Sequence, residues 1–232
     1  MGRLQASSFH ISPRGKRNED AILPLIHDGN YSLAAVADGL GGRENGHVAS
    51  LKAIQLTEAQ FLNGEHDAKN IMNKCHENFE ALLEPSKMAT TLTFALFNSS
   101  TATVGHVGDS RAYHLRGDGL LQVTQDQTEA QQLIDEGVLS KRRALSYHRK
   151  NVLLSAMGQN VPYHPFFRTF TIEAGDRIVL LTDGIAEIIL RKEMRDISAA
   201  SETAEDFCRT VEDELKRRTI RDDCSLAAVD VN

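Results

Sequence analysis

The sequence predicts an α+β fold built on antiparallel sheets. Segments with strand character are short and come in clusters, whereas a doubly wound parallel sheet would alternate each strand with a helix. Two pairs of neighbouring segments are separated only by turn residues, at 98–100 and 117–119, which predicts antiparallel hairpins. No internal repeat or Pro/Gly/Ser-rich linker divides the chain. We therefore expect a single domain over residues 1–232.

The individual elements follow from two periodicities of the apolar residues. Short runs that are apolar, or that alternate with polar residues, predict strands at 31–37, 91–97, 102–108, 111–116, 120–124, 167–172, 177–182 and 225–231. Apolar residues spaced three and four apart predict helices packed on a core at 47–62, 67–84, 126–137 and 202–218. Residues 138–165 predict a long irregular connection, a kind of segment that often carries function.

Composition disfavours several classes of protein. The 232 residues include 26 Lys and Arg against 32 Asp and Glu, a formal net charge of −6, which disfavours a dedicated nucleic-acid binder. No run approaches the roughly 18 apolar residues of a membrane span, and the N-terminus lacks the apolar stretch of a signal peptide. Three separated cysteines indicate neither a disulfide framework nor a cysteine metal site. We expect a cytoplasmic monomer with no nucleic-acid or membrane partner.

Acidic residues recur where apolar strands begin or end. Asp38, Asp109 and Asp183 each follow an apolar run, and each stands beside a glycine. The pairs Glu19–Asp20 and Asp222–Asp223 lie next to further apolar segments. A single Asp-Gly pair is usually only a turn. Five acidic sites of this kind indicate carboxylates gathered at the rim of the sheets.

Converging carboxylates point to divalent cations. Carboxylates within ~5 Å of one another repel, so their pKa values rise unless cations neutralise the charge. Oxygen ligands without a matching set of Cys or His favour hard ions such as Mg²⁺ or Mn²⁺. Two such ions activate water and bind both oxygens of an in-line displacement, which suits phosphoester hydrolysis. The residues alone therefore predict a two-metal phosphohydrolase.

Six segments, in order, resemble the metal-dependent Ser/Thr protein phosphatases of the PPM or type 2C class, with the bacterial branch closer. They are RNEDAIL (17–23), VADGLGGRENGHVAS (36–50), ATTLTFALF (89–97), VGHVGDSRAYHLRGDGLLQVTQDQT (104–128), LLTDGIAE (180–187) and RDDCSLAAV (221–229). The resemblance covers nearly the whole chain. It implies a four-layer α-β-β-α sandwich, two antiparallel sheets flanked by helices, with a flap-like loop at about 126–165.

The resemblance also implies a role for each acidic residue. The implied metal ligands are Glu19, Asp38, Gly39, Asp109, Asp183 and Asp222. Asp38 would bridge two central Mg²⁺ or Mn²⁺ ions and, with Asp183 and Asp222, carry the catalysis. Asp109 would help to hold a third, weaker ion. Asp20 would act mainly through water and orient the ligands. Asp223 stands where the family usually has Asn, so we expect a structural or orienting role for it rather than direct ligation.

Three positions depart from the family pattern. Five residues before the Asp of the Asn-Glu-Asp motif, the family's phosphate-binding arginine is replaced by Gly15. The segment is about two residues short, so Arg17 or Arg14 could bind phosphate; we favour Arg17 over the alternative of a plain surface cation. Leu40 stands where eukaryotic members have a His proposed as general acid. Residues 126–128, Asp-Gln-Thr, replace the bacterial Asp-His-Ser.

One basic cluster interrupts the acidic chain. It consists of Lys141, Arg142, Arg143, Arg149 and Lys150, with no acid between 140 and 151. Such a run is most often simply solvated. The alternative is that this part of the flap attracts phosphorylated or acidic segments of a substrate.

We therefore expect a Mg²⁺- or Mn²⁺-dependent phosphatase that hydrolyses phosphoserine and phosphothreonine by in-line attack of a metal-bridging hydroxide. Its partners would be phosphorylated proteins, the targets of a Ser/Thr kinase. One alternative is a catalytically silent regulatory domain of the same fold, which the retention of every carboxylate disfavours. Another is a phosphohydrolase for small metabolites or nucleotides. No cysteine lies in a CxxxxxR arrangement, which argues against a thiol nucleophile.

Overall fold

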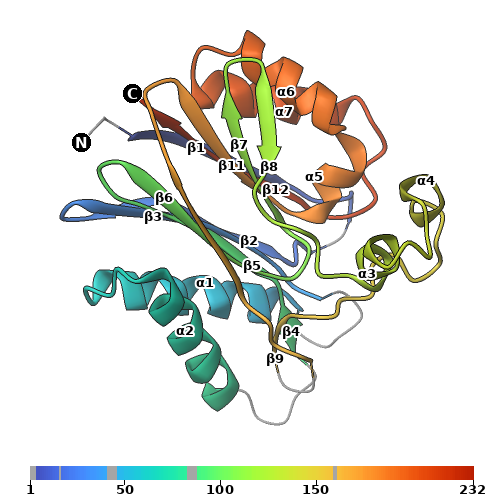
Figure 1. Cartoon of the computed structure of the whole chain (residues 1–232), viewed down its shortest axis with the longest axis horizontal. Helices are drawn as coiled ribbons and strands as arrows, with labels where there is room; N and C mark the ends of the chain where they lie inside the picture. Colours follow the sequence, from blue (N-terminus) through green and yellow to red (C-terminus); the bar gives the residue numbers. More distant parts are fainter. Residues whose placement is uncertain (1–3, 16, 41–45, 83–87, 159–160) are drawn as a thin grey trace.

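A computed structural model of the chain describes residues 4–15, 17–40, 46–82, 88–158 and 161–232. Two five-stranded sheets face each other at the centre, and helices cover the outer face of each (Figure 1). The first sheet has the strand order β1-β12-β11-β7-β8, and the second has the order β10-β6-β5-β3-β2. All of their pairings are antiparallel. The predicted α+β class and the implied four-layer sandwich are confirmed.

The bounds of the elements are as follows. The first sheet contains β1 (Leu4–Ile11), β7 (Arg111–Arg116), β8 (Gly119–Gln122), β11 (Asp176–Leu181) and β12 (Cys224–Val231). The second contains β2 (Asp20–Asp28), β3 (Tyr31–Asp38), β5 (Leu92–Phe97), β6 (Thr101–Val107) and β10 (Phe166–Thr171). A small third sheet pairs β4 (Ala89–Thr90) with β9 (Met157–Gly158).

The helices form the two outer layers and one projection. The second sheet is covered by α1 (Gly46–Leu62) and α2 (Ala68–Leu82) (Figure 1). The first sheet is covered by α5 (Asp183–Ile188), α6 (Arg191–Ala200) and α7 (Ala204–Lys216). To one side of the sheets project α3 (Glu129–Asp135) and α4 (Lys141–Ala144). Among the described segments, no helix combines the length and the apolar character that a membrane crossing needs.

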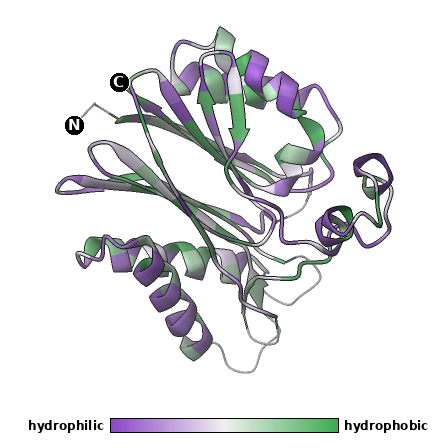
Figure 2. Cartoon of the chain, viewed as in Figure 1, coloured by the Kyte–Doolittle hydropathy of each residue, from purple (hydrophilic) through white to green (hydrophobic). Residues whose placement is uncertain are grey.

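Central strands are buried on both faces, which explains their almost continuous apolar sequence. In β3, Leu33 and Ala35 belong to the core beneath α1 and α2, whereas Ala34 and Val36 belong to the core between the sheets. Successive side chains of a strand point to opposite faces, so each strand contributes to two cores. A third core, which includes Phe207, lies between the first sheet and its helices. Figure 2 shows the apolar residues concentrated on the strands and the polar residues on the helices.

Most predicted elements are confirmed, with small shifts at their ends. The two predicted hairpins are present as β5–β6 and β7–β8. The helix predicted at 126–137 is shorter, because Thr128 caps α3 by accepting a hydrogen bond from the Gln131 N–H. The last two residues of the helix predicted at 67–84 lie outside the described residues.

Several elements are not indicated by the sequence pattern: β1, β2, β4, β9, α4, α5 and α6. The edge strand β2 contains Pro24 and a register shift between Leu23 and Ile26, which break its alternation. In α6 only Met194 is buried, so the helix shows almost no apolar stripe. The expectation that 138–165 is irregular is wrong in part, because this segment contains α4 and β9.

Candidate active site

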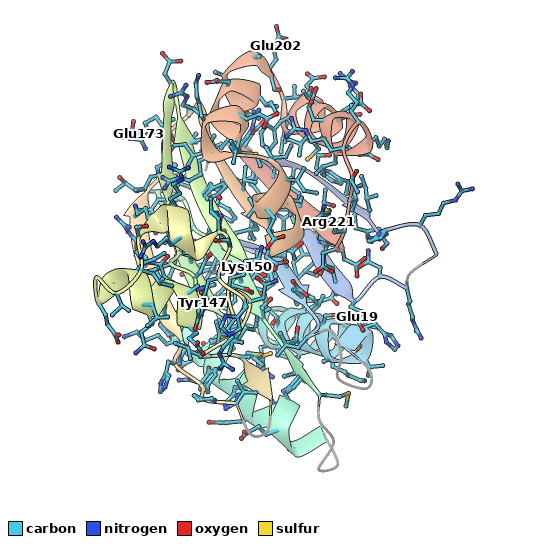
Figure 3. The ribbon with its side chains drawn as sticks, turned by 90° about the vertical axis from the view of Figure 1, so that its right-hand side faces the viewer. Glu19, Tyr147, Lys150, Glu173, Glu202 and Arg221 are labelled. Carbon is cyan, nitrogen blue, oxygen red and sulfur yellow. The ribbon has the colours of Figure 1, made fainter. Side chains whose placement is uncertain are left out.

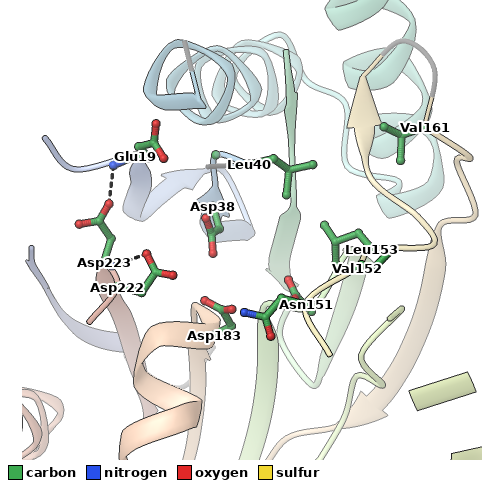
Figure 4. A pocket seen from close by; sticks show the side chains of 12 residues that line it. Glu19, Asp38, Leu40, Asn151, Val152, Leu153, Val161, Asp183, Asp222 and Asp223 are labelled. Atoms are coloured by element: carbon green, nitrogen blue, oxygen red, sulfur yellow. Dashed lines mark hydrogen bonds between the residues drawn. The ribbon is translucent and has the colours of Figure 1, made fainter. Parts of the chain in front are cut away.

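The acidic residues of the sequence come together around one pocket at the end of both sheets (Figure 4). The pocket has a volume of about 370 Å³ and is lined by Glu19, Asp38, Gly39, Leu40, Asp109, Asn151, Val152, Leu153, Val161, Asp183, Asp222 and Asp223. All six residues implied as metal ligands are in this set. Asp223 also lines the pocket, whereas Asp20 does not.

Glu19 and Asp38 are held side by side by the pairing of β2 with β3. Gly39 donates its N–H to the Glu19 carbonyl (3.0 Å), which continues this pairing beyond Asp38. The Asp38 N–H donates to Thr91 Oγ1 (2.9 Å), and the Asp38 carbonyl accepts from the Thr91 N–H (2.9 Å). A Cβ on Gly39 would lie 2.1 Å from the Gly46 carbonyl oxygen, so only glycine fits here. The backbone beneath the Asp38 side chain is therefore fixed.

Asp109 follows β6 in a turn that Gln127 holds in place. Gly108 has a φ of 110°, a conformation that favours glycine, and its N–H donates to Gln127 Oε1 (2.8 Å). Gln127 Nε2 donates to the His164 carbonyl (2.7 Å), and the Gln127 N–H donates to the Gly108 carbonyl (2.8 Å). Sequence reasoning missed this role and treated Gln127 only as a replacement for histidine. The sequence feature that could have identified Gln127 is its position in the 126–128 motif.

The first sheet supplies Asp183 and Asp222. Asp183 is the first residue of α5, directly after Thr182, in a helix that the sequence did not indicate. Asp222 precedes β12, and its Oδ1 accepts from the Asp223 N–H (3.0 Å). A Cβ on Gly184 would lie 2.0 Å from the Asp223 carbonyl oxygen. Glycine therefore lets α5 approach the start of β12 closely enough to bring the two carboxylates to one pocket.

Two further acids join the sheets behind the pocket. Asp223 Oδ2 accepts from the Glu19 N–H (2.7 Å), and Asp20 Oδ2 accepts from Thr182 Oγ1 (2.8 Å). Thr182 Oγ1 also accepts from the Ser225 N–H (3.0 Å). Each acid thus links the second sheet to the first. Thr182 is another residue that sequence reasoning missed.

The carboxyl groups of the pocket resist being charged together. Burial, and then the neighbouring aspartates, hold the pKa of Asp38 well above its usual range. Burial and then Asp183 do the same to the pKa of Asp109. Burial raises the pKa of Asp20 to about 7, against the hydrogen bond from Thr182, and raises the pKa of Asp183 to about 6. A cation in the pocket would oppose all four shifts.

These residues fit a site for divalent cations. The donors are oxygens, and Asp20 Oδ1 and Asp223 Oδ1 are buried with no hydrogen-bond partner in the described part of the chain. A buried carboxylate oxygen without a partner is costly, so it favours an ion or an ordered water. Among the described residues, no three His, Cys, Asp or Glu side chains stand close enough to form a metal site by themselves. Water would complete the coordination, as is usual for Mg²⁺.

The opposite side of the pocket is apolar and consists of Leu40, Val152, Leu153 and Val161 (Figure 4). Between the two sides, the Asn151 amide points toward Asp183. No Lys or Arg is among the described residues that line the pocket. Arg14 and Arg17 are both exposed and lie outside this lining, so the predicted phosphate-binding role of Arg17 stays a prediction.

The third edge of the pocket is the segment that carries α3 and α4. The Leu154 N–H donates to the Gln127 carbonyl (2.8 Å), and the Glu129 N–H donates to the Val152 carbonyl (2.9 Å). The chain therefore leaves the pocket and returns to it along antiparallel paths. Figure 3 views this end of the molecule, with Tyr147 and Lys150 on one side of the centre and Glu19 and Arg221 on the other.

Comparisons with known proteins agree over most of the chain. The family model described as protein phosphatase 2C matches residues 8–223. Protein phosphatase PhpP of Streptococcus pneumoniae is 27% identical over 201 residues, which are 81% of this chain and 80% of the relative. Serine/threonine phosphatase stp of Listeria welshimeri is 30% identical over 193 residues, 78% of this chain and 77% of the relative.

The fold is also shared with a solved structure. The catalytic domain of serine threonine protein phosphatase PstP, in complex with 2 manganese ions, superimposes with a TM-score of 0.79 at 26% identity. The superposition covers 98% of each chain. The family resemblance noted in the sequence is thus confirmed by the family match, by relatives named as protein phosphatases and by the fold. The chain belongs to the protein phosphatase 2C family.

Proposed function

We propose that this chain uses two divalent cations, Mg²⁺ or Mn²⁺, to hydrolyse phosphoserine and phosphothreonine in proteins. One observation carries the proposal: carboxylates from both sheets surround a single pocket, in which burial and then neighbouring carboxylates hold the pKa values of Asp38 and Asp109 above their usual range. Membership of a protein phosphatase family supports the reaction, and the manganese-bound relative supports the choice of metal.

We propose a role for each residue of the acidic rim, which consists of Glu19, Asp38, Asp109, Asp183 and Asp222. Asp38, Asp183 and Asp222 would hold the central pair of ions, together with Glu19 and the Gly39 carbonyl. Asp109 would help to hold a third ion, together with Asp183. When bound, such ions activate water for in-line attack on phosphorus and neutralise the charge of the phosphoryl oxygens.

The other residues of the site position this set of ligands. Asp223 fixes the backbone of Glu19, and Asp20 fixes Thr182, the residue before Asp183. Leu40 has no proton to give to the leaving serine oxygen. No His, Lys or Tyr is among the described lining residues, so we propose that this proton comes from water or from another group of the site. Arg17 is proposed to reach the phosphate from outside the pocket.

The apolar side of the pocket favours a phosphorylated amino acid over a nucleotide. Leu40, Val152 and Leu153 offer contact to the aliphatic part of a serine or threonine ester and to the adjacent backbone. A nucleotide base usually stacks on an aromatic ring, and none is among the described lining residues. The proposed substrates are proteins phosphorylated by a Ser/Thr kinase. The monomeric state and the cytoplasmic location stay predictions.

The test is the turnover of p-nitrophenyl phosphate with Mn²⁺ and after chelation. Asp38→Asn is expected to lower turnover on the order of 10³-fold, because it removes a central carboxylate without changing side-chain shape. Asp118→Asn is the matched control, since Asp118 is exposed in the β7–β8 turn and carries the same charge. Turnover that survives chelation, or that survives in Asp38→Asn, contradicts the proposed mechanism.

A further inference from the structure

The five cations of the flap fall into two groups. Arg149 Nε and Nη2 donate to Glu129 Oε2 at 2.9 and 2.6 Å, and Tyr147 donates its hydroxyl to the same carboxylate. Lys150 Nζ lies 2.5 Å from Glu187 Oε1 of α5. These two cations hold the flap to itself and to the body. In the part of the chain that the structure describes, no ion pair involves the remaining three, Lys141, Arg142 and Arg143.

The same three cations stand between two exposed apolar side chains. They belong to the short helix α4, which begins after Ser140, whose Oγ accepts from the Arg143 N–H (3.4 Å). Val138, before α4, is 64% exposed, and Leu145, after it, is 79% exposed. We call Val138, Lys141, Arg142, Arg143 and Leu145 the hairpin surface. It combines positive charge with apolar side chains on the part of the chain that projects beside the sheets (Figure 1).

The acids nearest in sequence leave this charge uncompensated. Asp135 and Glu136 end α3, and their carboxylates accept hydrogen bonds from the Gln131 and Gln132 amides. Neither forms an ion pair with a cation of α4 within the described segments. The hairpin surface is therefore positive within a chain whose net charge is −6.

The hairpin surface also lies a short length of chain from the pocket. Its last residue, Leu145, precedes Asn151, which lines the pocket, by six positions. The Val152 N–H donates to the Arg149 carbonyl (3.1 Å), and the Glu129 N–H donates to the Val152 carbonyl (2.9 Å), which holds this stretch in place. Six residues of chain span at most about 20 Å, so a substrate segment of similar length that starts in the pocket can reach Leu145.

We propose that the hairpin surface docks an acidic segment of the phosphoprotein substrate, one that also carries an apolar residue. The inference rests on the proposed function and adds the class of protein that the enzyme prefers. Complementary charge steers such a segment toward the pocket and lowers KM, while the chemical step depends on the rim alone. Anionic membranes and nucleic acids share the negative charge, but the net charge of the chain and the nearness of the pocket favour the substrate.

The main test replaces the three cations together, as Lys141→Gln/Arg142→Gln/Arg143→Gln. The matched control is Lys52→Gln/Arg191→Gln/Lys192→Gln, which removes the same charge from exposed positions outside the pocket lining. The substrates are a phosphothreonine peptide flanked by Glu and Leu, the same peptide with Gln in place of Glu, and p-nitrophenyl phosphate. Fluorescence anisotropy measures binding of the labelled peptides independently of turnover.

We expect the hairpin variant to lose roughly tenfold in kcat/KM for the acidic peptide, through KM, with a matching loss of binding. The loss shrinks as salt shortens the screening length to about 10 Å at 0.1 M and below that at higher salt. The neutral peptide, p-nitrophenyl phosphate and the control variant stay within about twofold of wild type. Leu145→Ser weakens binding of the acidic peptide without changing its salt dependence.

Other outcomes overturn the docking site. These are equal losses for both peptides, an equal loss in the control variant, and a wild type that binds both peptides alike. Binding of wild type to anionic vesicles or to nucleic acid, lost in the hairpin variant while peptide binding is unchanged, assigns the surface to that partner instead. A wild type that binds the acidic peptide but shows no metal-dependent turnover contradicts the proposed function and leaves the docking site supported.

Discussion

The acidic rim of the pocket and the flap hairpin, the projecting segment that carries α3 and α4, are built in opposite ways. Asp38 ends a strand whose residues from Leu33 to Ala37 are fully buried, and its backbone is paired on both sides. In α3 and α4, by contrast, only Ala130 and Ala144 are buried, and polar contacts hold the segment. Rim residues cannot move without disturbing the core, whereas hairpin residues can change at little cost in stability. This contrast agrees with the proposed roles, in which the rim performs the chemistry and the hairpin selects the substrate.

Among changes that remove no charge, Gly184→Ala is expected to have the largest effect, because it displaces the rim. The added Cβ would lie 2.0 Å from the Asp223 carbonyl oxygen, so α5 must move away from β12. We expect a loss of about 1–3 kcal/mol in the free energy of unfolding, and a loss of about 10²-fold in turnover. Gly119→Ala is the control, since its nearest atom would be the Arg116 carbonyl oxygen at 3.2 Å. Unchanged turnover in Gly184→Ala would show that the rim tolerates displacement.

Without metal, the stability of the folded chain should depend on pH, because its buried carboxyl groups resist ionisation. The folded pKa values of Asp20 (about 7) and Asp183 (about 6) exceed the ordinary value of 3.8, so the folded chain binds protons more tightly than the unfolded chain. The stability that protonation gives is complete below about pH 4 and is lost as pH rises through the folded values. We expect the Tm of the chelated protein to fall between about pH 4 and pH 7. Mn²⁺ should restore Tm, and most strongly at the higher pH; a flat profile would contradict this electrostatic account.

Gln127→Ala tests the contact at which the rim and the flap meet. The change leaves the Gly108 N–H and the His164 carbonyl without their partner. An unpaired buried donor costs about 1–3 kcal/mol, which denaturant unfolding can measure. Turnover should fall several-fold, because Asp109 follows Gly108. Gln132→Ala removes an exposed amide that donates to Glu136 and should change neither quantity.

Glu129→Gln should have the smallest effect of these changes, and it tests the flap rather than the acidic rim. It removes the ion pair with Arg149 at the surface of the flap. Exposed ion pairs contribute little to stability, so Tm and p-nitrophenyl phosphate turnover should stay close to wild type. Calorimetry and a steady-state assay suffice for this check. A large loss of turnover would mean that the flap takes part in the chemistry.

The sequence pattern predicts best the strands that are buried on both faces. Residues 177–182 and 225–231 are mostly apolar because both of their faces are buried, and this pattern is easy to recognise. The edge strand β1 has a mixed burial pattern, and α6 buries only Met194, so neither gives a clear periodicity. Patterns of polarity report burial, and they weaken where an element is half exposed.

The same limit applies to the site. The acidic residues can be recognised because several of them stand beside glycine, and the order of the six family-like segments indicates that they belong to one site. Gln127 and Thr182 are neutral, and their roles depend on Gly108 and Asp20, which are distant in sequence. A hydrogen bond between such positions leaves no local pattern. The docking role proposed for α4 likewise depends on the ion pairs of Arg149 and Lys150, which the sequence does not reveal.

Five of the fourteen described buried residues that form the core between the two sheets are alanines: Ala34, Ala95, Ala102, Ala112 and Ala227. Facing sheets stack ~10 Å apart, and the size of the side chains between them sets that spacing. Since Asp38 belongs to one sheet and Asp222 adjoins the other, these alanines also influence the distance between the carboxylates that are proposed to hold the cations. A larger residue at one of these positions would increase that distance without contacting a proposed ligand. Methyl groups in the middle of the molecule, which take no part in the chemistry, would therefore affect the reaction through the spacing of the proposed ligands.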